Sequence, residues 1–68
     1  MKAISGKRLC RLMEIRGWEL KRINGSHHIY AKSGSHLRIS VPVHGDTVLK
    51  IGLQKQLMKM ANIDESEL

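Results

Sequence analysis

Histidines are the residues of this sequence best suited to chemistry near neutral pH, since imidazole both accepts and donates protons there. Four of the 68 residues are histidines, and two of them, His27 and His28, are adjacent and follow Gly25-Ser26. RNA carries its own nucleophile, the 2′-hydroxyl, so a base, an acid and cationic phosphate clamps can cleave it without a metal. His27 and His28 are therefore candidate catalytic residues. The alternative is that both are ordinary strand residues.

The remaining candidates for chemistry are weaker. His36 adjoins a Ser-Gly-Ser turn and is most simply a solvated turn residue, whereas His44 begins a loop as either a loop cap or a phosphate contact. Ser26 has no acidic residue nearby to orient a histidine, so a Ser-His-Asp triad is unsupported. Cys10 falls within a predicted helix and is expected to pack there rather than act as a nucleophile. Tyr30 is either a base-stacking residue or part of the core.

Metal binding is the weakest interpretation of the histidines. Adjacent residues on a strand point to opposite faces, so His27 and His28 cannot easily bind one ion. No CxxC, HExxH or carboxylate cluster accompanies them. We expect neither a metal nor a small-molecule cofactor.

The charge of the chain favours a polyanionic partner. Twelve Lys and Arg face six acidic residues, giving a net charge of +6, and residues 1–61 hold all twelve cations with only three carboxylates, hence +9. Such a body attracts nucleic acid through its phosphates, although the charge could serve only solubility. The candidate RNA contacts lie around the predicted strands: Lys21, Arg22, Gly25, Ser26, Lys32, Arg38 and His44. For the charged strand residues the alternative is simple exposure to solvent.

The same composition argues against a membrane. No apolar run approaches the ~20 residues of a membrane span, and no signal-peptide pattern opens the chain. A lone cysteine excludes an intramolecular disulfide and suits a reducing compartment. We therefore expect a cytoplasmic protein.

The elements that must position these residues follow from the spacing of apolar residues. Ser5 is a predicted N-cap, Ile4 before it could pack on Leu9, and Gly17 fits the position after the helix end. Strands are predicted from Trp18 to about Ile23, over His27–Lys32, and around Leu37, Ile39 and Val41 up to Pro42. Asn24-Gly25 and Ser33-Gly34-Ser35 are predicted turns.

A second helix is predicted from Leu49 or Lys50 to Ala61, with Leu53, Leu57, Met60 and Ala61 as its apolar stripe. Gly52 either permits close packing or precedes the helix. Asp64 and Glu67 resemble a capping pattern for a short terminal turn. The predicted fold is a single α+β domain over residues 1–68, α-β-β-β-α, with a three-stranded antiparallel sheet and both helices on one face. Double-stranded-RNA-binding domains share this layout.

Three segments together resemble the HicA (YcfA-like) toxin family. They are Gly17-Trp18-Glu19-Leu20 with Asn24 to Tyr30, then Val41-Pro42-Val43-His44, then Gly52 to Ile63. The resemblance implies a toxin of a type II toxin–antitoxin system, an mRNA interferase held inactive by a HicB-type antitoxin, and it places the functional histidine on His27. Asn62 departs from the usual glycine, and Gln54 stands where the family commonly has an apolar residue.

Strand alternation disagrees with that assignment. It places His27 with Ile29 and Ala31 toward the core, and His28 with Tyr30 outside, unless a bulge or the open hairpin end exposes His27. We keep His28 as the second choice. The leading hypothesis is a metal-independent endoribonuclease. The alternatives are a non-catalytic RNA-binding module of the same fold, and an interaction protein whose basic surface docks an acidic partner.

Overall fold

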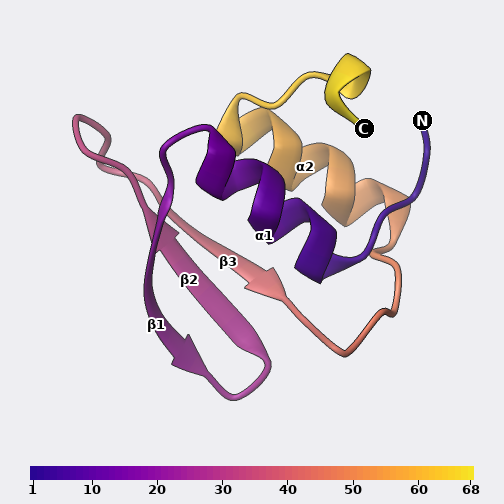
Figure 1. Cartoon of the computed structure of the whole chain (residues 1–68), viewed down its shortest axis with the longest axis horizontal. Helices are drawn as coiled ribbons and strands as arrows, with labels where there is room; N and C mark the ends of the chain where they lie inside the picture. The colour runs from indigo at the N-terminus through magenta and orange to yellow at the C-terminus, as the bar shows by residue number, and fades with distance from the viewer.

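Two helices cover one face of a three-stranded antiparallel sheet, as Figure 1 shows. The computed structural model describes all 68 residues. The elements in chain order are α1 (Gly6–Ile15), β1 (Glu19–Asn24), β2 (His27–Ala31), β3 (Arg38–Pro42), α2 (Ile51–Ala61) and a 3-10 helix, η1 (Glu65–Glu67). The strands are ordered β1-β2-β3. This confirms the predicted α-β-β-β-α layout. No helix is long and apolar enough to cross a membrane.

Both ends of α1 are fixed by the residues that the sequence predicted. The Ser5 side chain accepts a hydrogen bond from the Arg8 N–H, which satisfies one of the unpaired donors of the first turn. Gly17 has φ +92°, and Trp18 N–H donates to the Met13 carbonyl (3.0 Å). This is a Schellman ending, in which a left-handed glycine lets the chain leave the helix.

The turn between β1 and β2 differs from the prediction by one residue. Asn24 pairs with His27, so Gly25 and Ser26 form the two-residue loop, and only Gly25 has a positive φ (+63°). A glycine at the first loop position is typical of a type II′ turn, whereas an Asn-Gly loop would be type I′. Asn24 is therefore the last residue of β1, and His27 begins β2 directly after the turn.

The face assignment of the two histidines from alternation was wrong. Ile39 and Val41 are fully buried under the helices, and their cross-strand partners are Tyr30 and His28. Directly paired residues share a face, so His28 and Tyr30 point toward the helices and His27 points to the opposite, uncovered side. Alternation alone does not say which of the two faces is covered, and the buried ring of Tyr30 marks the His28 face as the packed one.

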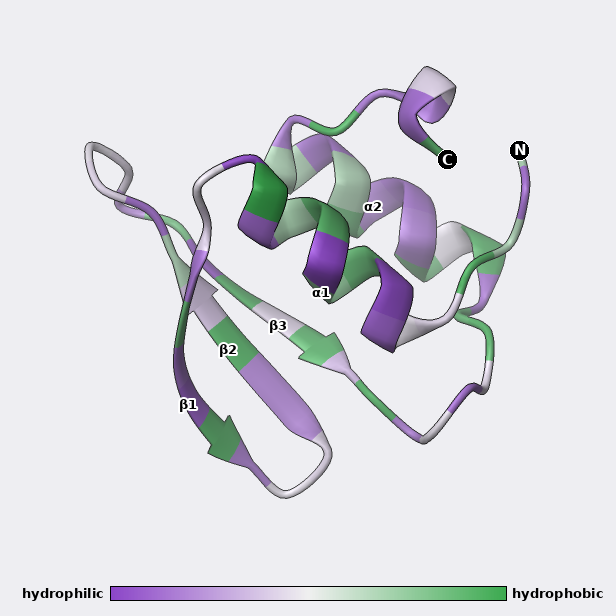
Figure 2. Cartoon of the chain, in the orientation of Figure 1, coloured by the Kyte–Doolittle hydropathy of each residue, from purple (hydrophilic) through white to green (hydrophobic).

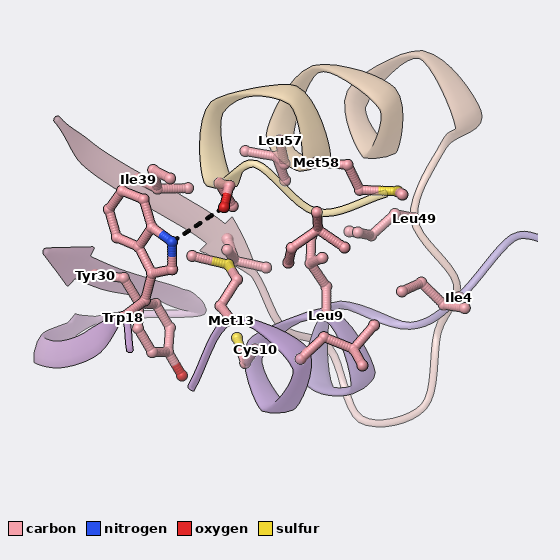
Figure 3. Packing of buried hydrophobic residues seen from close by; sticks show 14 residues of the cluster. Ile4, Leu9, Cys10, Met13, Trp18, Tyr30, Ile39, Leu49, Leu57 and Met58 are labelled. Atoms are coloured by element: carbon pink, nitrogen blue, oxygen red, sulfur yellow. Dashed lines mark hydrogen bonds between the residues drawn. The ribbon is translucent and has the colours of Figure 1, made fainter. Parts of the chain in front are cut away.

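The packed face holds the core. Leu9 and Met13 of α1 belong to a single buried cluster with Ile39 and Leu57 (Figure 3). Figure 2 shows hydrophobic and hydrophilic bands along α1. The cations of this helix, Lys7, Arg8 and Arg11, are exposed to solvent, as predicted. The indole N–H of Trp18 donates to the Ala61 carbonyl oxygen (3.2 Å), and this bond joins the start of the sheet to the end of α2.

The buried stripe of α2 is rotated from the predicted one. Leu53 is exposed and Met60 only partly buried, while Gln54 and Met58 are buried beside Leu57 and Ala61. Gln54 is buried because its amide pairs with the N-terminal segment: Oε1 accepts from Ile4 N–H (2.8 Å), and Nε2 donates to the Lys2 carbonyl (2.7 Å).

The glycines near the two helix starts differ in how closely other residues approach them. Gly52 lies inside α2 with open space around it, so neither predicted explanation for it holds. Gly6, at the start of α1, meets β3 so closely that a Cβ there would lie 1.9 Å from the Pro42 carbonyl oxygen.

The C-terminal segment is held by the capping pattern that the sequence predicted. Asn62 ends α2 in the left-handed region (φ 59°), which asparagine tolerates almost as glycine does, so this departure from the family pattern preserves the backbone. Asp64 and Glu67 form a reciprocal capping box on η1. Glu67 also forms an ion pair with Arg16. These contacts hold the acidic end of the chain near the end of α1.

Candidate active site

The uncovered side of the sheet, here called the open face, presents His27 to solvent. His27 is the first residue of β2 and lies between Asn24 of β1 and Pro42 of β3. It needs neither a bulge nor a frayed hairpin end to be exposed, because ordinary strand alternation places it there. An exposed imidazole beside a tight turn is accessible to a large substrate.

A bulge in β1 turns Arg22 onto the open face near His27. Leu20 pairs with Tyr30 on the helix side, and the register then shifts so that Arg22 pairs with Ile29. Without the extra residue at Lys21, Arg22 would point toward the helices. Arg22 and His27 are diagonal neighbours, whose separation of roughly 7–8 Å lies within reach of a long side chain. The guanidinium is thus placed to contact an anion held at His27.

His44 adjoins the same end of the sheet. Val43 N–H donates to the Ser26 carbonyl (2.8 Å), which continues the β2–β3 pairing past the hairpin turn. His44 follows directly and is exposed. The sequence-predicted residues Arg22, Gly25, Ser26, His27 and His44 are therefore gathered at the hairpin end of the sheet.

Three of the other predicted RNA contacts lie elsewhere. Arg38 pairs with Ala31, four residues along β3 from the partner of His27, which is about 14 Å at the usual strand rise. The Lys32 ammonium lies 5.9 Å from the Trp18 ring centroid, a cation–π contact. Lys21 forms an ion pair with Glu19 (3.0 Å) in the bulged strand. The structure does not bring these side chains to His27.

The helix side of the hairpin carries a second group of polar residues. A groove of about 210 Å³ lies between α1 and the sheet, and Figure 1 shows the hairpin extending beyond α1. The groove is lined by Lys7, Cys10, Arg11, Glu14, Leu20, His28, Tyr30 and Val43. His28, the second candidate, therefore faces a different environment from His27, and the two histidines cannot act on one phosphate.

A hydrogen bond between Tyr30 of β2 and Glu14 of α1 connects the two sides of this groove. The Tyr30 hydroxyl donates to Glu14 Oε2 (2.6 Å). Burial, and next this hydrogen bond, raises the pKa of the Tyr30 phenol far above its ordinary value. Burial also raises the pKa of the Cys10 thiol, so Cys10 is a poor nucleophile, in keeping with its predicted packing role. Reasoning from the sequence missed this pair, since nothing in the spacing of Glu14 and Tyr30 connects them.

The charged surface is mostly unpaired. Only Arg16 and Lys21 among the twelve Lys and Arg form an ion pair within the chain, so ten cations have no carboxylate partner, and of these Lys32 contacts the Trp18 ring. No three His, Cys, Asp or Glu side chains gather as they would to bind a metal ion. The hairpin end thus combines two exposed histidines, a nearby guanidinium and a basic surrounding surface. These groups are suited to binding a phosphodiester and moving protons at it.

Comparison with known proteins identifies the family. The family model described as the HicA toxin of bacterial toxin–antitoxin matches residues 6–63, which span α1 to the segment after α2. No curated protein matches the chain. The matched region contains the whole hairpin end of the sheet as well as the groove.

Proposed function

The chain belongs to the HicA toxin family of bacterial toxin–antitoxin systems, and we propose on that basis that it is an endoribonuclease that cleaves mRNA at the open face, with His27 as a general acid–base catalyst. Family membership also implies pairing with an antitoxin. The observation that carries the proposal is the exposed position of His27, beside the Gly25-Ser26 turn and diagonal to Arg22.

The proposed reaction uses the 2′-hydroxyl of the RNA as nucleophile. A base takes the 2′-hydroxyl proton while the oxygen attacks phosphorus, and an acid donates a proton to the departing 5′-oxygen, leaving a 2′,3′-cyclic phosphate. We propose that His27 supplies one of these groups and His44 the other, since the backbone next to His44 pairs with Ser26 beside His27. Arg22 neutralises charge that develops on the phosphoryl oxygens, which matters most in the transition state. None of these steps calls for a metal or another cofactor.

The test compares cleavage of a long, mixed-sequence RNA by the wild type, His27→Ala, His28→Ala and His36→Ala, each with and without EDTA. His36 is a matched control because it is an exposed histidine in the loop between β2 and β3. Losing a general acid–base catalyst typically costs about 10²–10⁴-fold in rate, so His27→Ala should lose activity and His36→Ala should keep it. Wild-type cleavage should survive EDTA and leave cyclic phosphate ends.

Two results would redirect the proposal. If His27→Ala cleaves as fast as the wild type while His28→Ala does not, the reaction belongs to the helix-side groove. If the wild type shifts RNA on a gel without cutting it, the protein is an RNA-binding module, an alternative that the ten unpaired cations favour.

The same surface suggests how the antitoxin acts. A HicB-type antitoxin that inhibits the nuclease is expected to cover the open face around His27 with carboxylates that meet Arg22 and His44. Such a nuclease acts on mRNA in the cytoplasm, where the unpaired Cys10 stays reduced. Inhibition should then weaken with added salt and with Arg22→Ala.

A further inference from the structure

We propose that the groove between α1 and the β1–β2 hairpin is a second contact site for RNA, in which Lys7 and Arg11 bind the phosphodiester backbone. This inference rests on the proposed function for the identity of the ligand, but it concerns the opposite side of the hairpin from His27. The groove opens between α1 and the strands that carry the catalytic candidate.

The cationic wall of the groove comes from α1. Lys7 and Arg11 are four residues apart, so they lie on one helix face with Cβ atoms about 5–6 Å apart. Both are exposed, neither has an ion-pair partner, and both line the groove. Two unpaired cations on one wall can therefore contact successive anionic groups of a chain-like ligand.

The opposite wall is suited to the rest of a nucleotide. Leu20 and Val43 give it apolar surface, and His28 gives it an imidazole ring, whereas the Tyr30 ring beneath them is buried. Leu20 is 43% exposed and Ile23, which faces the same side, is 57% exposed, so the helices leave this part of the hairpin uncovered. Exposed apolar side chains and an imidazole ring opposite a cationic wall match a ligand with bases on one side and phosphates on the other.

The one carboxylate in the groove does not cancel this charge. Glu14 accepts the hydrogen bond of the Tyr30 hydroxyl through Oε2, which orients the carboxylate toward the protein and leaves its single negative charge in place. The two positive charges of Lys7 and Arg11 outweigh the single negative charge of Glu14. An acidic segment of a protein partner would pair with Lys7 and Arg11 but would not cover the exposed apolar side chains of the other wall. The mixed lining therefore favours RNA.

The test is binding of a labelled, single-stranded, fully 2′-O-methylated RNA, which has no 2′-hydroxyl nucleophile and so stays intact. Affinity is measured by fluorescence anisotropy at several salt concentrations for the wild type, Lys7→Ala/Arg11→Ala and Lys55→Ala/Lys59→Ala. The second pair consists of exposed lysines of α2 outside the groove, so both variants lose the same charge. Circular dichroism checks that each variant is folded.

Each phosphate contact to a single strand contributes about 0.7 to the slope of log affinity against log salt. The groove variant should therefore bind more weakly with a slope lower by roughly 1.4, and the α2 variant should keep the wild-type slope. Equal slopes for all three proteins, or equal losses in both variants, would overturn the groove, as would a wild type that binds no RNA.

The outcome is separable from that of the proposed function. If the wild type cleaves unmodified RNA and the groove variant binds like the α2 variant, the groove is not an RNA contact site, and the proposed nuclease activity stands. A groove variant with the reduced slope, together with a wild type that never cleaves, leaves an RNA-binding groove on a protein without the proposed activity.

Discussion

Gln54 offers a sharp test of the structure, because the sequence and the structure favour opposite outcomes for its replacement by leucine. Gln54 lies on the buried face of α2 together with Leu57, Met58 and Ala61, and its side chain is fully buried. By pattern alone, Gln54→Leu should complete the apolar stripe and stabilise the protein. The structure shows instead that the amide closes two hydrogen bonds with the N-terminal segment.

The cost follows from those bonds. Leucine would leave the buried Ile4 N–H without an acceptor, and an orphaned buried donor costs about 1–3 kcal/mol. The Lys2 carbonyl also loses its donor. A net loss near the middle of that range, about 2 kcal/mol, lowers Tm of a 60–100-residue domain by roughly 8–16 °C. At about 0.05–0.15 kcal/mol per residue, the whole chain has only roughly 3–10 kcal/mol of stability.

Urea and thermal unfolding followed by circular dichroism measure this effect. Gln56→Leu is the matched control, since Gln56 is an exposed glutamine two residues along α2, and its change should stay within about 0.5 kcal/mol. If Gln54→Leu is as stable as the wild type or more so, the Gln54 amide does not hold the N-terminal segment as described. The assignment of Gln54 to the buried face of α2 would then be wrong as well.

Two further predictions concern the glycines of the two helices and the contact between α1 and Tyr30. Gly6→Ala should destabilise the protein by about 2–3 kcal/mol or more, because the new Cβ meets the Pro42 carbonyl. Gly52→Ala, in open space on α2, should instead stabilise it by about 0.5–1 kcal/mol. Urea titration of both variants measures the two free energies of unfolding, and equal changes in both would contradict this prediction. Tyr30 is the only tyrosine, and its pKa is raised in the folded state by burial and then by Glu14, so its stabilising effect is complete below the ordinary tyrosine pKa of about 10 and declines as the pH rises above it. The tyrosinate absorbance should therefore rise only together with unfolding seen by circular dichroism, and a reversible titration near pH 10 in a folded protein would contradict the buried pair.

Local features were determined by the sequence alone. The Ser5 cap, the Gly17 ending, the strand order and the Asp64–Glu67 capping box depend on residues close together in the chain, where side-chain chemistry and backbone preference act directly. The basic character of the surface likewise follows from composition. These features were enough to predict the fold, whereas the family was indicated by the resemblance of three sequence segments.

The placement of the site was decided by tertiary structure. Which face of β2 is covered depends on where the helices pack, and alternation gives only the two possible faces, so the same pattern could bury His27 or expose it. The bulge at Lys21, which turns Arg22 to the open face, and the glutamine that replaces an apolar side chain in α2 are also settled by distant partners. A periodic pattern records that a side chain is on one of two faces, and only packing chooses which of them is buried.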